Sequence, residues 1–116
     1  MTSFELEERD TADARLRLVE VSGELDLTNA RELEGRLEEL ATDERVLALD
    51  LNRVLFIDSA ALHVLFRAAR NVGDGRFGLV LEPSAAIART LEIVGMAQVV
   101  PMFRDPAELT PADAPS

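Results

Sequence analysis

Segments typical of strands and segments typical of helices alternate along most of this chain, and only short connections separate them. Such alternation predicts parallel strands joined by right-handed crossovers. If every crossover turns the same way around neighbouring strands, the helices cover one face of the sheet. Strands are predicted at residues 4–7, 14–22, 46–51, 77–81 and 98–103, and helices at about 29–42, 59–72 and 84–94.

The first strand is predicted to be an antiparallel addition beside the second strand. In both strands charged side chains alternate with apolar ones, as expected where one face of a sheet is left uncovered. The predicted fold class is therefore α/β, with a mostly parallel sheet of about five strands and three to four helices packed mainly on one face. A further helical turn is predicted at residues 105–109.

The chain length favours a single domain. A chain of 116 residues can build one modest core, and no internal repeat divides it. The domain is expected to span residues 1–109. Residues 110–116 consist of Thr, Pro, Ala, Asp and Ser, and this composition predicts a disordered tail.

The charge of the chain limits its partners. A formal net charge of −10, from 22 acidic and 12 basic residues, repels phosphate backbones and anionic membrane surfaces. The sequence also lacks the Trp and Tyr side chains on which bases stack. These features argue against nucleic-acid binding and favour a protein partner that carries a basic patch.

Several other kinds of protein are disfavoured by composition. Without cysteine there is no disulfide, thiol nucleophile or thiolate metal site, and we expect neither a cofactor nor a metal ion. No apolar run approaches the roughly 20 residues that a membrane-spanning helix needs. The acidic N-terminus lacks the basic start of a signal peptide, so a cytoplasmic location is expected.

Two helices carry polar residues at informative positions. Asn29 and Glu32 have the spacing of a capping box at the start of the first helix. The second helix is apolar over most of its circumference, and its polar residues His63, Arg67 and Arg70 fall on one narrow stripe. That stripe is predicted to face solvent.

The start of the second helix is the strongest candidate for a functional site. Apolar strand formers end at Asp58-Ser59, and helix formers without Gly or Pro then continue to Gly73. A hydroxyl at the first turn of a helix lies beside unpaired backbone N–H groups and the positive end of the helix dipole. A phosphate attached to Ser59 would therefore be well placed.

This junction resembles the phosphorylation-site segment of the anti-sigma factor antagonists, the family that defines the STAS domain. Its signature is an apolar pair, Asp-Ser, a small residue, Gly and Leu, and residues 56–62 match it except that Ala61 replaces the Gly. Residues 23–26, Gly-Glu-Leu-Asp, match a second family motif. A closing segment, Gly95-Met96 followed by residues 99–103, is also similar, so the resemblance spans about residues 21–103.

The resemblance implies a regulatory function. Such proteins bind a kinase-type anti-sigma factor and thereby release a sigma factor. The kinase uses ATP to phosphorylate the serine that matches Ser59, which ends the interaction until a phosphatase reverses it. The residues expected to bind the partner are Asp26, Asp58, Ser59, Ala60, Ala61 and His63. A methyl group at Ala61, in place of the family Gly, is expected to hinder the approach of the partner or of a nucleotide phosphate.

Each of these residues has a simpler alternative role. Ser59 or Asp58 can serve only as a helix cap, Asp26 can stabilise the turn before the first helix, and His63 can be a solvated surface residue. The chain can also be an unphosphorylated STAS interaction subunit of a signalling or lipid-transport complex. An enzyme that uses Ser59 and His63 as nucleophile and base is the least supported reading, because no orienting acid or oxyanion loop is evident.

Overall fold

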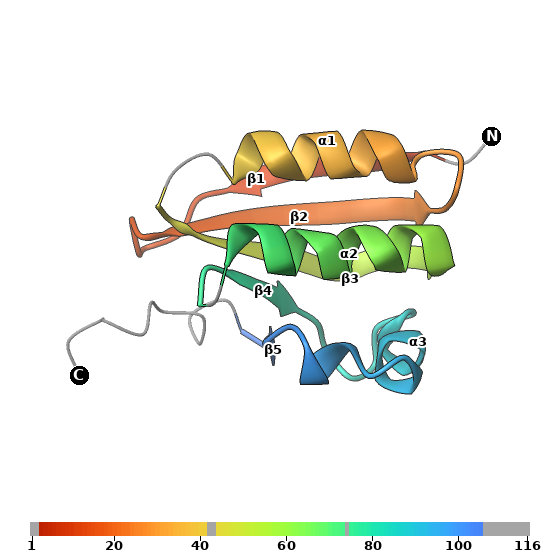
Figure 1. The fold of residues 1–116 in the computed structure, drawn as a ribbon. Helices are drawn as coiled ribbons and strands as arrows, with labels where there is room; N and C mark the ends of the chain where they lie inside the picture. Colours follow the sequence, from red (N-terminus) through yellow and green to blue (C-terminus); the bar gives the residue numbers. More distant parts are fainter. Residues whose placement is uncertain (1–2, 42–43, 74, 106–116) are drawn as a thin grey trace.

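The computed structural model describes residues 3–41, 44–73 and 75–105, and it shows a five-stranded sheet with strand order β1-β2-β3-β4-β5 (Figure 1). β1 is antiparallel to β2, and the other neighbouring strands are parallel. The predicted α/β fold with an antiparallel first strand is confirmed. The strands are β1 (Phe4–Arg9), β2 (Leu16–Leu25), β3 (Val46–Ile57), β4 (Phe77–Val80) and β5 (Met102–Phe103); the helices are α1 (Ala30–Leu40), α2 (Ser59–Val72), α3 (Ala88–Ile93) and the 3-10 helix η1 (Met96–Gln98).

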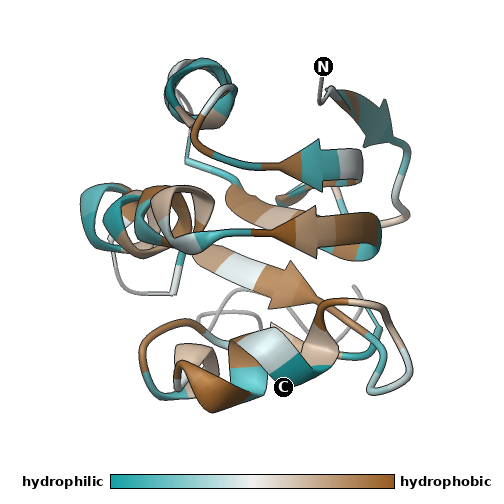
Figure 2. Cartoon of the chain, turned by 90° about the vertical axis from the view of Figure 1, so that its right-hand side faces the viewer, coloured by the Kyte–Doolittle hydropathy of each residue, from teal (hydrophilic) through white to brown (hydrophobic). Residues whose placement is uncertain are grey.

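Helices α1 and α2 lie side by side on one face of the sheet, while α3 lies beyond β4 (Figures 1 and 2). Alternate residues of β2 and β3 point towards these helices, because successive side chains of a strand face opposite ways. The main core forms between the layers. It includes Val19, Val21 and Leu25 of β2, Leu47, Leu49 and Leu51 of β3, Leu33 and Leu37 of α1, and Val64 and Leu65 of α2.

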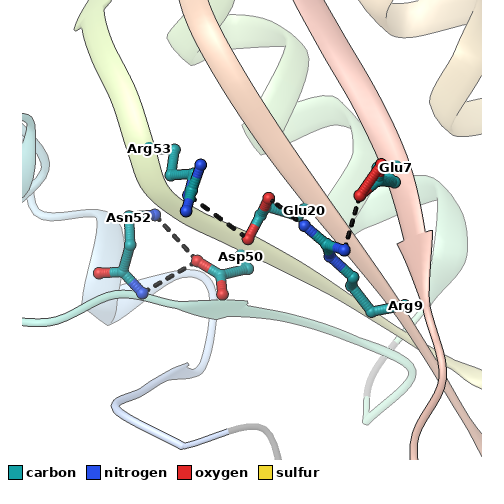
Figure 3. A network of polar contacts seen from close by, with 6 residues as sticks. All are labelled: Glu7, Arg9, Glu20, Asp50, Asn52 and Arg53. Atoms are coloured by element: carbon teal, nitrogen blue, oxygen red, sulfur yellow. Dashed lines mark hydrogen bonds and ion pairs between the residues drawn. The ribbon is translucent and has the colours of Figure 1, made fainter.

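The opposite face of the sheet carries a polar network (Figure 3). Arg9 contacts Glu7 at 2.7 Å and Glu20 at 2.8 Å, and Arg53 lies 3.8 Å from Glu20. The carboxylate of Asp50 accepts two hydrogen bonds from Asn52, one from its backbone and one from its side chain. Beside this network, a small apolar cluster comprises Leu16, Val46, Ala48 and Val80. The alternation of charged and apolar residues in the first two strands correctly indicated this polar face.

β3 is longer than predicted. The sequence indicated a strand at 46–51, whereas β3 continues to Ile57 because β2 pairs with it as far as Leu25. Two register shifts, opposite Glu20–Ser22 and opposite Gly23–Glu24, each leave one extra residue on β3, and the two strands stay paired beyond them. The extension delivers the chain directly to Ser59, at the end of the sheet where α1 and α2 begin (Figure 1).

The end of the chain differs more from the prediction. The third helix begins at Ala88, after turns closed by hydrogen bonds from Ala85 to Glu82 and from Ala88 to Ala85. The strand predicted at 98–103 is only two residues long, because Met96 and Val100 are buried through a 3-10 turn instead of by alternation. The predicted helical turn at 105–109 falls mostly outside the described residues, and the predicted tail at 110–116 lies wholly outside them.

Within the described parts of the chain, none of the helices has both the length and the apolar character needed to cross a membrane.

Gly23 occupies a position that only glycine fits without strain. Its φ angle is +101°, in the region that side chains disfavour, and a Cβ atom there would lie 2.4 Å from the carbonyl oxygen of Ser3. That carbonyl accepts a 2.9 Å hydrogen bond from the backbone N–H of Glu24. The glycine therefore lets the start of the chain close against β2 near the end of that strand.

Replacing this glycine should destabilise the fold. We expect Gly23→Ala to lower the free energy of unfolding by about 2–4 kcal/mol, since it combines an unfavourable φ with a steric clash. Gly35→Ala is the matched control, because Gly35 lies on α1 with nothing within 4 Å of an added Cβ. The control should raise stability by about 0.5–1 kcal/mol. Urea denaturation measures both, and equal stabilities of the two variants would contradict this role of Gly23.

Candidate functional site

The two neighbouring parallel strands β2 and β3 finish at the same edge of the sheet, where α1 and α2 begin (Figure 1). The loop that follows Leu25 therefore lies beside the junction at Asp58 and Ser59. A 3.1 Å hydrogen bond from the backbone N–H of Asp58 to the carbonyl of Leu25 joins them. Such strand ends are the usual position of binding sites in open α/β sheets.

Asp58 connects this loop to helix α2. One oxygen of its carboxylate accepts a 3.1 Å hydrogen bond from the backbone N–H of Ala61, which caps the helix. The other oxygen accepts a 2.9 Å hydrogen bond from the backbone N–H of Leu27. The capping role considered for Asp58 is thus confirmed, and the same side chain also holds the β2–α1 loop against the start of α2.

Ser59 is the first residue of α2 and is exposed. Among the described residues, no hydrogen bond engages its hydroxyl group, whereas Asp58 performs the capping. Two other predicted site residues lie close by on the helix: Ala60 follows Ser59 and is partly exposed, and His63 lies one turn further on and is exposed. The structure brings these three residues together at an accessible surface.

Ala61 is placed differently. Its side chain is completely buried and belongs to the main core. The expectation that its methyl group stands in the way of a partner does not agree with the structure, because the methyl points into the protein. Its backbone N–H is already bonded to Asp58, so Ala61 acts on the site through the geometry of the helix start.

The loop before α1 is held by its own side chains. Asp26 accepts hydrogen bonds from the backbone N–H (2.9 Å) and hydroxyl (2.5 Å) of Thr28. The buried side chain of Asn29 accepts one from the backbone N–H of Asp26 and donates one to the carbonyl of Glu24. Asn29 makes no capping hydrogen bond to α1, so the predicted capping box with Glu32 is wrong. The side-chain amide of Asn29 instead closes the loop before α1. Asp26 stabilises the turn, which was the simpler alternative considered for it.

Large exposed apolar side chains surround this edge, and the sequence analysis did not identify them. Leu27 in the loop is 76% exposed, and Leu55 and Phe56 at the end of β3 are 70% and 49% exposed. Exposed apolar side chains that gather on one region mark interaction surfaces. The sequence analysis could not find them because it assumed simple alternation, which cannot place residues 55 and 56 both outside the core. The two register shifts of the β2–β3 pair break that alternation.

A groove of about 330 Å³ lies next to Ser59, between the N-terminal halves of α1 and α2. On its walls Arg67 forms a two-pronged ion pair with Glu34, with N–O distances of 2.7 and 3.1 Å. This hydrogen bonding lowers the pKa of Glu34 and raises the pKa of Arg67.

The predicted polar stripe of the second helix is confirmed, since His63 and Arg70 are exposed and Arg67 is half-exposed. The described residues contain no cluster of three His, Asp or Glu that could hold a metal ion.

Removing the Asp58 carboxylate should weaken both of its attachments. We expect Asp58→Ala to lower the free energy of unfolding by about 1–3 kcal/mol, because two backbone N–H groups lose their partner. Asp58→Asn keeps one acceptor oxygen and should cost less. The exposed Glu39 of α1 provides a control, and Glu39→Ala should change stability by under about 0.5 kcal/mol.

Hydrogen exchange measures this effect locally. The amides of Leu27 and Ala61 should lose protection in Asp58→Ala and retain it in Glu39→Ala. Unchanged protection of both amides in Asp58→Ala would show that Asp58 does not hold the two segments together.

The family model of the STAS domain matches residues 3–109. A crystal structure of an anti-sigma factor antagonist from Mycobacterium paratuberculosis superposes with a TM-score of 0.78 at 26% identity, covering 92% of this chain and 91% of that chain. No curated protein was matched by sequence.

Two more distant structures share the fold. The phosphorylated form of the Bacillus cell fate determinant SpoIIAA superposes with a TM-score of 0.59 at 14% identity, covering 92% of this chain and 96% of that chain. A sulfate transporter family protein from Wolinella succinogenes gives a TM-score of 0.66 at 19% identity, covering 86% and 85%. The match of the family model over nearly the whole chain is decisive: this chain belongs to the STAS domain family.

Proposed function

We propose that this chain is an anti-sigma factor antagonist whose binding to a kinase-type anti-sigma factor is switched off by phosphorylation of Ser59. The observation that carries the proposal is the accessible Ser59 hydroxyl at the start of α2, at an edge where a neighbouring residue already caps the helix. A serine needed only as a cap would itself bond the helix N–H groups. The similarity to the mycobacterial antagonist supports the same function.

The surroundings of Ser59 suit a surface that a partner covers. Leu27, Leu55 and Phe56 present apolar area at the ends of β2 and β3, and burial of that area favours association. A kinase that docks at this edge would also come within reach of Ser59, so we expect binding and phosphorylation to use overlapping surfaces. A protein with this role acts in the cytoplasm and also requires a phosphatase that restores the free hydroxyl.

The charge of a phosphate explains the switch. Phosphorylation adds a charge of about −1.5 to −2 beside Asp58, on a chain whose net charge is already −10. In the free protein the helix terminus and solvent accommodate this charge, with the terminus contributing about 0.3–1 kcal/mol. A partner docked against the edge would have to bury the added charge, which is unfavourable. Phosphorylation therefore weakens binding and leaves the fold intact.

Variants of Ser59 test the charge directly. Ser59→Ala should bind the anti-sigma kinase with or without ATP, whereas wild type should lose binding when the kinase is given ATP. Ser59→Asp should bind at least about tenfold more weakly, a difference of about 1.4 kcal/mol. Ser59→Asn is the matched control, since it has the shape of Asp without the charge, and it should bind close to the level of Ser59→Ala. Isothermal titration with the kinase measures these affinities.

Two outcomes would overturn the proposal. Equal affinities of Ser59→Asp and Ser59→Asn would show that charge at this position does not control binding. If incubation with the kinase and ATP adds no phosphate to Ser59, the chain is better explained as an unphosphorylated STAS interaction subunit of a signalling or lipid-transport complex.

A further inference from the structure

The groove between α1 and α2 differs in charge from the rest of this acidic chain. Three of its lining residues are basic or can become so, and one is acidic. The full lining is Leu27, Ala30, Arg31, Glu34, Ala60, His63, Val64 and Arg67. The groove thus combines apolar side chains with polar ones that make up more of its exposed surface, and basic groups lie on both helices, although the chain carries a net charge of −10.

The cations of the groove are not all neutralised. Arg67 is matched by Glu34, which takes both arms of its guanidinium group. Arg31 is exposed and forms no ion pair with another described residue, although it lies close enough to contribute to the lowered pKa of Glu34. Arg31 therefore leaves one uncompensated positive charge on the α1 wall, and His63 adds a second from the α2 wall when it is protonated.

The nearby carboxylates do not cancel this charge by pairing with it. Both oxygens of Asp58 accept backbone N–H groups, from Leu27 and Ala61. Asp26 is bonded to Thr28 within its own loop. An anion that enters the groove would therefore find Arg31 and His63 without another ion-pair partner among the described residues.

We propose that this groove binds an acidic side chain carried on an apolar segment of the partner, with Arg31 and His63 as the groups that contact the carboxylate. This inference rests on the proposed function and adds the chemistry of the partner. The apolar side chains of the lining fit the flanking residues of such a segment, and the Arg31 cation and the imidazole N–H of His63 fit its carboxylate. His63 lies one helical turn after Ser59, so a phosphate on Ser59 would also compete for the imidazole.

The geometry can be tested without the partner, because His63 is the only histidine in the chain. Its imidazole resonances in an NMR spectrum at fixed pH report changes around the groove. Arg31→Glu should shift these resonances, because it alters a side chain of the same lining. Arg36→Glu makes the same charge change at an exposed position outside the groove lining and should leave the resonances in place. If the His63 resonances coincide in the two variants, Arg31 and His63 do not share the groove.

Binding to the anti-sigma kinase tests the occupant. With Ser59 unphosphorylated in both variants, Arg31→Glu should bind the kinase at least about tenfold more weakly than Arg36→Glu. This difference in affinity should shrink at high salt. If both variants bind as tightly as wild type while Ser59→Asp does not, the groove proposal is wrong and the proposed function stands. If Ser59→Ala protein does not bind the kinase at all, the proposed function fails, and the groove proposal fails with it.

Discussion

The carboxylate of Asp58 is the contact on which the arrangement of the site depends. It accepts one hydrogen bond from the first turn of α2 and another from the loop that follows β2. Because Asp58 caps the helix, Ser59 does not have to, and its hydroxyl stays accessible at the surface. A single side chain thereby positions the helix, fixes the neighbouring loop and leaves a nucleophilic oxygen available for modification.

The pairing of β2 with β3 and the contact at Gly23 hold the strand ends that carry this contact. β2 and β3 stay paired to their ends because extra residues of β3 take up two register shifts, one of them opposite Gly23 and Glu24. Gly23 in turn allows the carbonyl of Ser3 to bond Glu24, so the edge strand closes over the same region. On the open face of the sheet, charged side chains pair with one another in a network of Glu7, Arg9, Glu20 and Arg53 (Figure 3). The edge that carries Asp58 and Ser59 is therefore built on the most extensively paired part of the sheet.

Periodicity and motif residues predicted the fold and the strand-to-helix junction at Asp58 and Ser59. They did not predict the hydrogen bonds or the exposure of side chains whose position depends on tertiary contacts. The exposed Ser59 and the cap at Asp58 follow from a strand that runs into a helix, which is a local pattern. The amide of Asn29 could not be assigned, because its partner Glu24 lies on β2 beside a register shift in the pairing with β3. Exposure of Leu55 and burial of the Ala61 methyl likewise depend on how the strands and helices pack. Residue type alone predicts the opposite for Leu55.

The central claim is that one added anion at Ser59 decides whether a partner stays bound. The most direct measurement is the dissociation constant of one anti-sigma kinase for the unmodified chain and for the same chain fully phosphorylated at Ser59, both confirmed as folded by circular dichroism. The account predicts that phosphorylation weakens binding by at least about tenfold while the fold is unchanged. Equal dissociation constants for the two forms would contradict it.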